Sequence, residues 1–236
     1  MFAVQKRIPK TLIWPLVGLF VLGGFQGFLG WWMVSSGLSE LTSVSQYRLA
    51  AHLSAACVLW LALIWVARGL EPPVRDRKPS SGWTFAVWGL LGMLFLQIAA
   101  GAFVAGLDAG SSHNTWPLMD GQIIPAGLLA MDPAWRNVFE NVMTVQFQHR
   151  LGAYVLVLAV VALVVMTLRT NAHKGLRGTA LLLGLAVLLQ AAIGIVTLLL
   201  HVKLDVALTH QAMAVIVLGL SVEYLVRLKG EAPFRS

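Results

Sequence analysis

The amino-acid sequence predicts an all-α polytopic membrane protein with six transmembrane helices, and two observations support this class. Of the 236 residues, 58% are hydrophobic and only 11% are charged, which is too little charge for the surface of a soluble domain. Apolar stretches of roughly 20 residues, the length that crosses a bilayer, recur along the chain. Six spans are expected, at about residues 12–35, 48–68, 84–107, 144–168, 177–200 and 206–227.

The first span is expected to be retained, because the small-residue cleavage site of a signal peptide does not follow it. The basic residues then set the orientation of all six spans. Thirteen of the seventeen Lys and Arg residues fall on one set of connections, against four on the other: Arg48, Arg136, Arg150 and Lys203. By the positive-inside rule, both termini are cytoplasmic. The net charge of +7 is therefore a topology signal, and we expect no nucleic-acid partner.

A two-helix unit occurs three times in the sequence. Its first helix carries Gln-x3-Gly, and its second helix carries His-x3-Ala. Histidine is rare and costly inside a membrane helix, so its repetition indicates chemistry. The small residue four positions on leaves an open patch on the same helix face, where a flat macrocycle can lie while the imidazole reaches its metal. The copies are Gln26/Gly30 with His52/Ala56, Gln97/Gly101 with His149/Ala153, and Gln190/Gly194 with His210/Ala214.

The glycines and glutamines of the first helices each have a structural interpretation. Gly30, Gly101 and Gly194 let helices approach closely, and we favour this packing role over contact with a cofactor. The three glutamines need polar partners in a dry bundle, either a neighbouring backbone group or an imidazole.

His149 and His210 occupy matching places in consecutive copies of the unit, so pseudo-symmetry is expected to bring them to the same depth on facing helices. Two neutral imidazoles with one iron between them are a common haem ligation, and we interpret the pair as axial ligands. The alternative is a pair of buried histidines bonded to backbone carbonyls. Arg150 follows His149 and suits a haem propionate, or else it is an interfacial arginine whose head reaches water.

His52 has the same local pattern, with Arg48 one turn before it, but no fourth histidine helix faces it. Three copies of a unit that works in pairs suggest that one copy is missing. We expect either that the chain dimerises or that a further hairpin precedes residue 1.

The connection from Asp108 to Asn141 is the one long excursion between spans, and it is expected on the outer side. Within it, Pro133–Asn141 has apolar residues at helical spacing and is expected to lie flat at the membrane interface. Long ordered loops are usually lids or binding surfaces, although a surface linker is the alternative. The single cysteine, Cys57, is interpreted as a small buried hydrophobe.

Five segments of the chain resemble the heme A synthase family, in its mitochondrial and alphaproteobacterial branch. The resemblance extends essentially from residue 8 to residue 228. Its most specific parts are the NTWPLMDG stretch, residues 114–121, and the QFQHRLGAY stretch, residues 146–154. The five segments are Gly23–Val34, Arg48–Leu53, Gly106–Gly121, Phe139–Tyr154 and Leu208–Gln211.

The resemblance implies two pseudo-symmetric four-helix halves. The C-terminal half is similar to residues 84–228, where His149 and His210 match the axial ligands of a b-type haem. The N-terminal half of the family binds heme O, and His52 matches one of its two histidines. The other histidine lies in a Glu-x-x-His helix that precedes the first span seen here, together with the family's proposed catalytic glutamate. No catalytic residue is therefore assigned in this chain.

The expected organisation is an incomplete N-terminal half at 1–83 and a four-helix haem-binding half at 84–236. The expected activity is oxidation of a ring methyl of heme O to the formyl group of heme A, for cytochrome oxidase biogenesis, with haem b as cofactor. His149, His210 and Arg150 would bind the cofactor, and His52 and Arg48 the substrate haem. The alternative is a non-catalytic b-type haem protein for electron transfer or assembly.

The expected location is the bacterial inner membrane. Beyond heme O and the lipid bilayer, the expected partners are heme O synthase or cytochrome oxidase assembly factors, and a homo-oligomer is a further possibility.

Overall fold

The computed structural model describes residues 8–37, 43–71, 81–170 and 172–230. Six long helices account for most of them, and each is long and apolar enough to cross a membrane. The expectation of an all-helical membrane protein with six spans is confirmed. Every predicted span agrees with a helix to within three residues at either end. The helices are α1 (Lys10–Val34), α2 (Gln46–Arg68), α3 (Ser81–Gly106), α5 (Val142–Arg169), α6 (Lys174–Leu199) and α7 (Leu204–Lys229).

The long outer connection contains three short helical pieces: η1 (Ala109–Ser111), η2 (Ala134–Arg136) and α4 (Asn137–Glu140). The last two confirm that Pro133–Asn141 is helical. An isolated bridge joins Met119 and Gln122, whose backbone groups bond each other in both directions at 2.9 and 3.1 Å. Asn141 then starts α5, since its side chain accepts hydrogen bonds from the amides of Met143 and Thr144.

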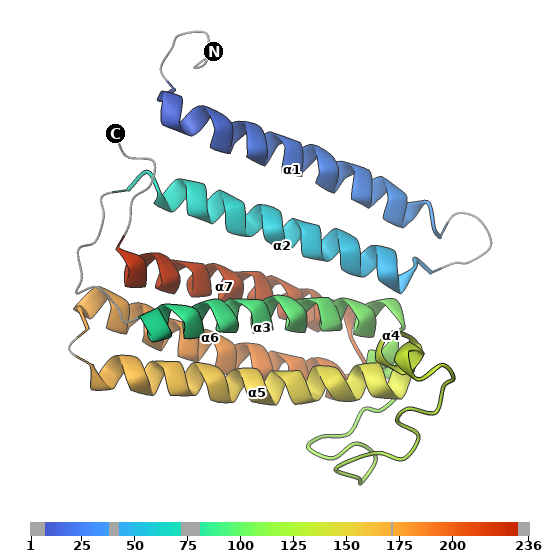
Figure 1. The fold of residues 1–236 in the computed structure, drawn as a ribbon. Coiled ribbons are helices and arrows are strands. Elements are labelled where there is room, and N and C mark those ends of the chain that lie inside the picture. Colours follow the sequence, from blue (N-terminus) through green and yellow to red (C-terminus); the bar gives the residue numbers. More distant parts are fainter. Residues whose placement is uncertain (1–7, 38–42, 72–80, 171, 231–236) are drawn as a thin grey trace.

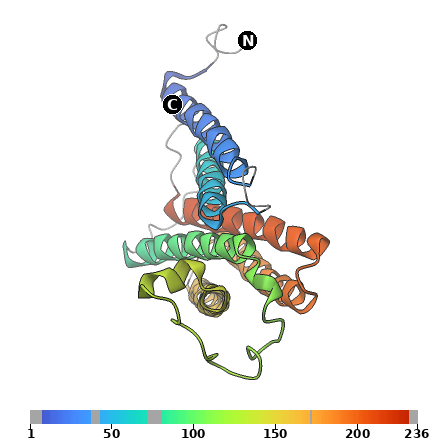
Figure 2. The same ribbon diagram turned by 90° about the vertical axis from the view of Figure 1, so that its right-hand side faces the viewer.

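Helices α3, α5, α6 and α7 form a four-helix bundle (Figures 1 and 2). Neighbours in the bundle are α3 and α5, α5 and α6, α6 and α7, and α7 and α3, so α5 and α7 lie across its diagonal. Helix α2 packs against both α3 and α7, and α1 packs against α2. Figure 2 shows the α1–α2 hairpin extending from one side of the bundle.

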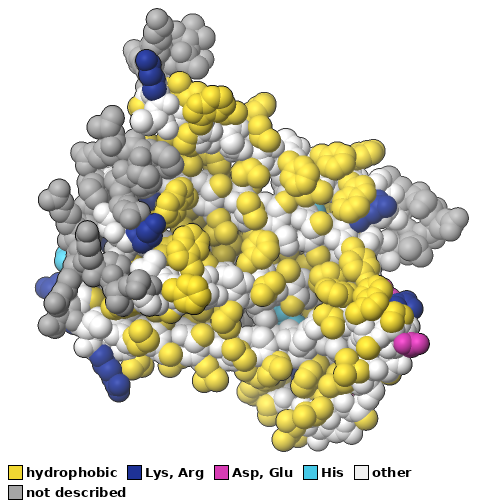
Figure 3. All heavy atoms as spheres, in the orientation of Figure 1, with side chains coloured by type: hydrophobic (Ala, Val, Ile, Leu, Met, Phe, Trp, Pro, Cys, Tyr) yellow, Lys and Arg dark blue, Asp and Glu magenta, His cyan; other side chains and the backbone are white. Residues whose placement is uncertain are grey.

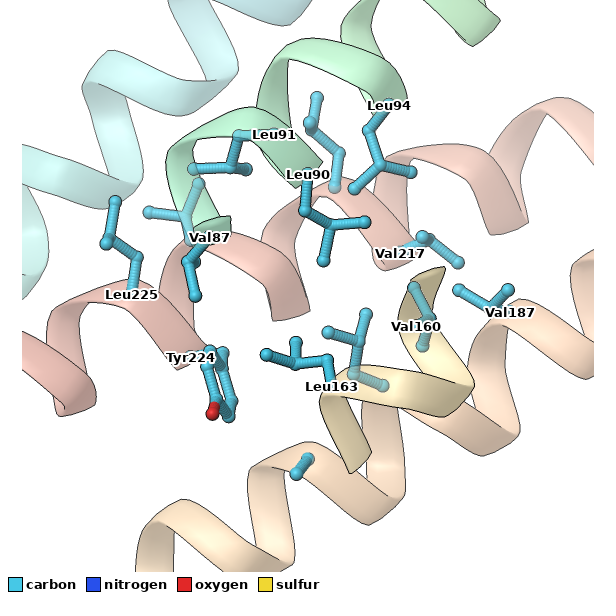
Figure 4. Close-up of a cluster of buried hydrophobic side chains, with 14 of the residues drawn as sticks. Val87, Leu90, Leu91, Leu94, Val160, Leu163, Val187, Val217, Tyr224 and Leu225 are labelled. Atoms are coloured by element: carbon cyan, nitrogen blue, oxygen red, sulfur yellow. The ribbon is translucent and has the colours of Figure 1, made fainter. Parts of the chain in front are cut away.

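The bundle is held by a continuous apolar core toward the end where α7 terminates (Figure 4). Leucine and valine side chains from α3, α5 and α6 interlock with α7. Its buried Tyr224 shares a hydrogen bond of 2.7 Å with Thr167 of α5. The labelled core residues are Val87, Leu90, Leu91 and Leu94 of α3, Val160 and Leu163 of α5, Val187 of α6, and Val217, Tyr224 and Leu225 of α7.

The outward faces of the helices are strongly apolar (Figure 3). On α1, Trp14 is 79% exposed and Phe20 is 84% exposed, a degree of exposure that water would penalise and lipid tails accept. The chain is therefore a multi-pass membrane protein, and its exposed apolar surface is the lipid-facing one.

The hairpin and the bundle are joined by polar contacts at both ends of the helices. At one end, the Arg68 guanidinium of α2 lies 2.7 Å from the Glu223 carboxylate of α7, which also pairs with Arg227. At the other end, the Tyr47 hydroxyl of α2 donates to Glu140 at 2.8 Å, and Arg136 donates to the same carboxylate at 2.7 Å. These two hydrogen bonds lower the pKa of Glu140, with that from Arg136 contributing most.

Candidate functional site

His149 lies two turns into α5 and turns its ring toward α3. The ring rests against Gly101, where an added Cβ would lie 3.1 Å from the imidazole Cε1. The side-chain amide of Gln97, one turn earlier on α3, lies 3.1 Å from the ring Nδ1 and donates to the backbone carbonyl of His149 at 2.8 Å. Gly152, one turn after His149, leaves the space that this amide fills.

His210 is seated in the same way between α7 and α6. A Cβ added to Gly194 would lie 2.7 Å from the imidazole Cε1, the tightest of the three seats. The Gln190 amide lies 3.4 Å from the ring Nε2.

His52 repeats the arrangement in the α1–α2 hairpin. A Cβ added to Gly30 would lie 3.1 Å from its Cε1. The Gln26 amide lies 3.5 Å from the ring Nε2 and donates to the His52 carbonyl at 3.1 Å. Each copy of the repeated unit is therefore one helix pair in which Gln and Gly of the first helix hold the histidine of the second. We call this arrangement the imidazole cradle.

The cradles clarify both interpretations of the small and polar residues. The glycines do serve packing, as the sequence favours, but the group that they admit is an imidazole. The amide nitrogens of all three glutamines reach an imidazole, and those of Gln26 and Gln97 also donate to a backbone carbonyl. Glycines outside the cradles differ, since a Cβ on Gly23, Gly24 or Gly27 would meet nothing within 4 Å.

His149 and His210 belong to helices α5 and α7, which lie diagonally opposite each other in one bundle. The Nδ1 atoms of His210 and His52 are buried without a hydrogen-bond partner among the described residues. An unpartnered buried nitrogen is costly unless it binds something. Two imidazoles held from opposite sides of a bundle, with ring nitrogen to spare, fit the donor set that haem iron takes.

Arg150 is occupied by the outer loop. Its guanidinium donates to the carbonyls of Thr115 at 2.8 Å and His113 at 2.6 Å, and to the Gln146 side chain at 3.1 Å. Gln146 in turn donates to the carbonyls of Ala109 and His113. Arg150, beside His149, thus holds the loop to α5 by these hydrogen bonds. Contact of Arg150 with a propionate stays a prediction.

Arg48 is likewise engaged, by α1. Its guanidinium donates to the Trp32 carbonyl at 2.8 Å and to Ser35 at 3.2 Å, and it lies 4.7 Å from the centre of the Trp32 ring. It therefore braces the hairpin one turn before His52.

Three further contacts fix the loop that contains residues 107–141, and the sequence argument did not single out their residues. Asn114 donates to the Leu198 carbonyl at the end of α6, and Trp116 donates to the Tyr154 hydroxyl. The backbone amide of Asp120 donates to the Thr115 hydroxyl. The polar, turn-rich composition of this stretch was the available signal, but the helix that each side chain reaches could not be read from it.

A family model described as cytochrome oxidase assembly protein (COX15-CtaA) matches residues 1–222. The chain belongs to this family. Curated relatives with the name heme A synthase come from Allorhizobium ampelinum, 51% identical over 98% of this chain, and from Chelativorans sp., 51% identical over 99% of it. A third, from Rhizobium etli, is 49% identical over 98% of the chain. The chain spans about 64% of the length of these relatives.

Proposed function

We propose that the chain acts in heme A synthesis, in which one ring methyl of heme O is oxidised to a formyl group for cytochrome oxidase. The relatives that carry the name heme A synthase share about half of their aligned residues with it. The three imidazole cradles supply the kind of ligand that both a haem cofactor and a haem substrate require.

The cofactor is a b-type haem between His149 and His210, and one observation carries this assignment. Both imidazoles are held by equivalent glutamine and glycine pairs inside a single four-helix bundle. A purely structural histidine needs only a partner for each ring nitrogen, whereas Nδ1 of His210 is buried and unpartnered.

The α1–α2 hairpin is the substrate side of the proposal. His52 is held as His149 is, and Arg48 is near enough in sequence to meet a propionate one turn away. Because Arg48 is braced by Trp32, a propionate would meet a guanidinium whose direction is already fixed. The described residues give no basis for assigning a catalytic acid or base.

The protein's own contribution is orientation and exclusion of water. A bound haem would supply electron transfer. Oxidation of the methyl through a hydroxymethyl to a formyl group removes four electrons, which must pass to an external acceptor, and adds one oxygen atom from outside the chain. His149 and His210 fix the cofactor's axis. Arg150 and Gln146 keep the outer loop closed over the end of α5. The bilayer-facing surface keeps the whole site in a medium of low polarity.

We further propose a bacterial inner-membrane location with both termini cytoplasmic, because the described basic residues at helix ends are mostly at the end where α1 begins and α7 terminates. The 1–83 and 84–236 division separates the substrate side from the cofactor side. Heme O synthase, assembly factors of cytochrome oxidase and a second copy of the chain are the proposed protein partners.

The test combines spectroscopy with product analysis. The full chain, purified from membranes of cells that make heme O, is expected to show a low-spin b-type spectrum, and the cells are expected to accumulate heme A. Bound haem without heme A would support the alternative, a haem protein for electron transfer or assembly. A protein with no low-spin haem would overturn both.

A further inference from the structure

We propose that Gln97 and Gln190 are positioning residues that orient the axial imidazoles and set the reduction potential of the haem. This inference rests on the proposed haem site and deepens it. It assigns a role to the polar residue of each cradle, which acts on iron only through the histidine that it holds.

The geometry at Gln97 shows how this works. One amide reaches both the ring nitrogen of His149, at 3.1 Å, and the backbone carbonyl of the same residue, at 2.8 Å. Two contacts to one residue fix the rotation of the ring about its own bonds, because the backbone carbonyl is itself immobile in α5. At Gln190 the contact is to the ring of His210, at 3.4 Å, and the ring is also held against Gly194.

The Gln97 amide fits into space left by the missing side chain of Gly152. A Cβ at this position would collide with the Gln97 side-chain oxygen, so the amide could not keep its present place with any larger residue there. The equivalent positions after His52 and His210 are Ala55 and Met213, both of which have a Cβ. The amides there stand slightly farther from their rings, at 3.5 and 3.4 Å. The distance between amide nitrogen and ring nitrogen is thus shortest in the cradle of His149.

Glutamine is suited to this task because its amide is both donor and acceptor and carries no charge in the bilayer. A haem-ligating imidazole binds iron through one nitrogen and carries a proton on the other. The protonated nitrogen needs an acceptor, and the strength of that acceptor tunes the ligand. A half-turn of the amide offers its oxygen to the protonated ring nitrogen; at Gln97 this bond would replace the one that the amide donates to the His149 carbonyl. The side-chain oxygens of Gln26 and Gln190 are buried and unpartnered in the described residues, and so are available for this bond.

The experiment compares Gln97→Leu, Gln97→Glu and Gln148→Leu in the full chain carrying its haem. Gln148 is the matched control, since it precedes His149 directly but donates its amide to the Val138 carbonyl, away from the ring. Gln97→Leu is expected to raise the reduction potential and weaken haem retention by about 10- to 100-fold, as loss of an outer-shell partner does. Gln97→Glu, a stronger acceptor of the same length, is expected to lower the potential and keep the haem. Gln148→Leu is expected to match the unmodified protein.

A second variant covers the case in which Gln97→Leu does not fold. Gly152→Ala keeps the glutamine but occupies its space, and it is expected to shift the potential in the same direction as Gln97→Leu. Equal potentials in the unmodified protein, Gln97→Leu and Gly152→Ala would overturn the inference, as would shifts of the same sign in the Leu and Glu variants. Failure of the proposed haem site looks different, because the unmodified chain would then bind no haem at all. Failure of heme A synthesis alone would leave the bound haem and the expected shifts in potential in place.

Discussion

The α1–α2 hairpin and the four-helix bundle hold a histidine by the same device but are stabilised by different forces. In the bundle, the cradles of His149 and His210 sit on a shared apolar core to which α3, α5, α6 and α7 all contribute. In the hairpin, the cradle of His52 lies between two helices, and α1 packs mainly on α2. The contacts that hold each imidazole are therefore the same in both regions, whereas the contacts that hold the helices together differ.

Polar contacts do much of the work of attaching the hairpin to the bundle. They occur at three levels along α2: Tyr47 with Glu140, the Trp60 indole with the Val215 carbonyl at 3.2 Å, and Arg68 with Glu223. Between lipid-exposed helices the hydrophobic effect gives little drive for association, so hydrogen bonds and close packing decide which helices stay together. The hairpin therefore joins the bundle through these polar contacts and through the apolar side of α2, where Cys57 lies in the shared core.

The largest expected effect comes from removing the proposed haem ligands, and it differs between the two regions. His149→Ala or His210→Ala is expected to abolish the low-spin spectrum of the bundle haem, with retention falling more than about 100-fold, beyond the loss of an outer-shell partner. His52→Ala is expected to leave that spectrum unchanged. Absorption spectra of the three purified variants check this. Loss of the low-spin spectrum in His52→Ala would contradict the assignment of separate haem sites to the hairpin and the bundle.

The next effect tests the cradles through their glycines. Gly194→Ala places a Cβ 2.7 Å from the His210 ring and is expected to cost about 1–3 kcal/mol, as overpacking does, and to weaken haem retention. Gly27→Ala is the control, because its Cβ meets nothing within 4 Å and alanine is the better helix former by about 1 kcal/mol. Thermal unfolding in detergent is expected to show a lower Tm for the first and an unchanged or higher Tm for the second.

A smaller effect is expected at the ion pair between hairpin and bundle. The side chains of Arg68 and Glu223 are only 16% and 21% exposed. Loss of the Glu223 carboxylate removes a counter-charge from both Arg68 and Arg227, although Arg68 keeps Glu71 as a second partner. Such a loss costs about 3–5 kcal/mol at a fully buried pair and less here. Glu223→Gln is expected to loosen α2 from α7 while leaving the bundle haem in place. Hydrogen exchange of α2 amides is expected to accelerate, and acceleration confined to α5 would contradict the assignment.

The smallest effect is a pH dependence at the other end of α2. Hydrogen bonds from Arg136 and Tyr47 lower the pKa of Glu140, so its ionised form favours the folded contact. This contribution is present above the ordinary value of 4.5 and is lost as the pH falls through the lowered pKa of the folded protein. Proteolysis of the outer connection is expected to rise below about pH 4.5 and to be pH-independent over that range in Glu140→Gln.

Periodicity and repetition in the sequence were sufficient to predict the spans and the three copies of the Gln–His unit, because helix length and the i, i+4 relation are local properties. The clearance that Gly152 gives Gln97 was beyond reach, since it depends on the distance between α3 and α5. The same holds for Arg150, whose partners come from a loop more than 30 residues earlier in the chain. A guanidinium beside a ligand histidine suggests a propionate on chemistry alone, and the fold of the loop gives it other partners.

The double contact of Gln97 with His149 affects the free energy with which the imidazole would bind a ligand. An imidazole that these two contacts hold in the folded chain has lost its rotational freedom during folding. Ordering one such side chain at the moment of capture would otherwise weaken binding by roughly 0.5–1.5 kcal/mol. A porphyrin whose iron bound His149 would therefore meet a ring whose orientation is already set, which favours tight binding.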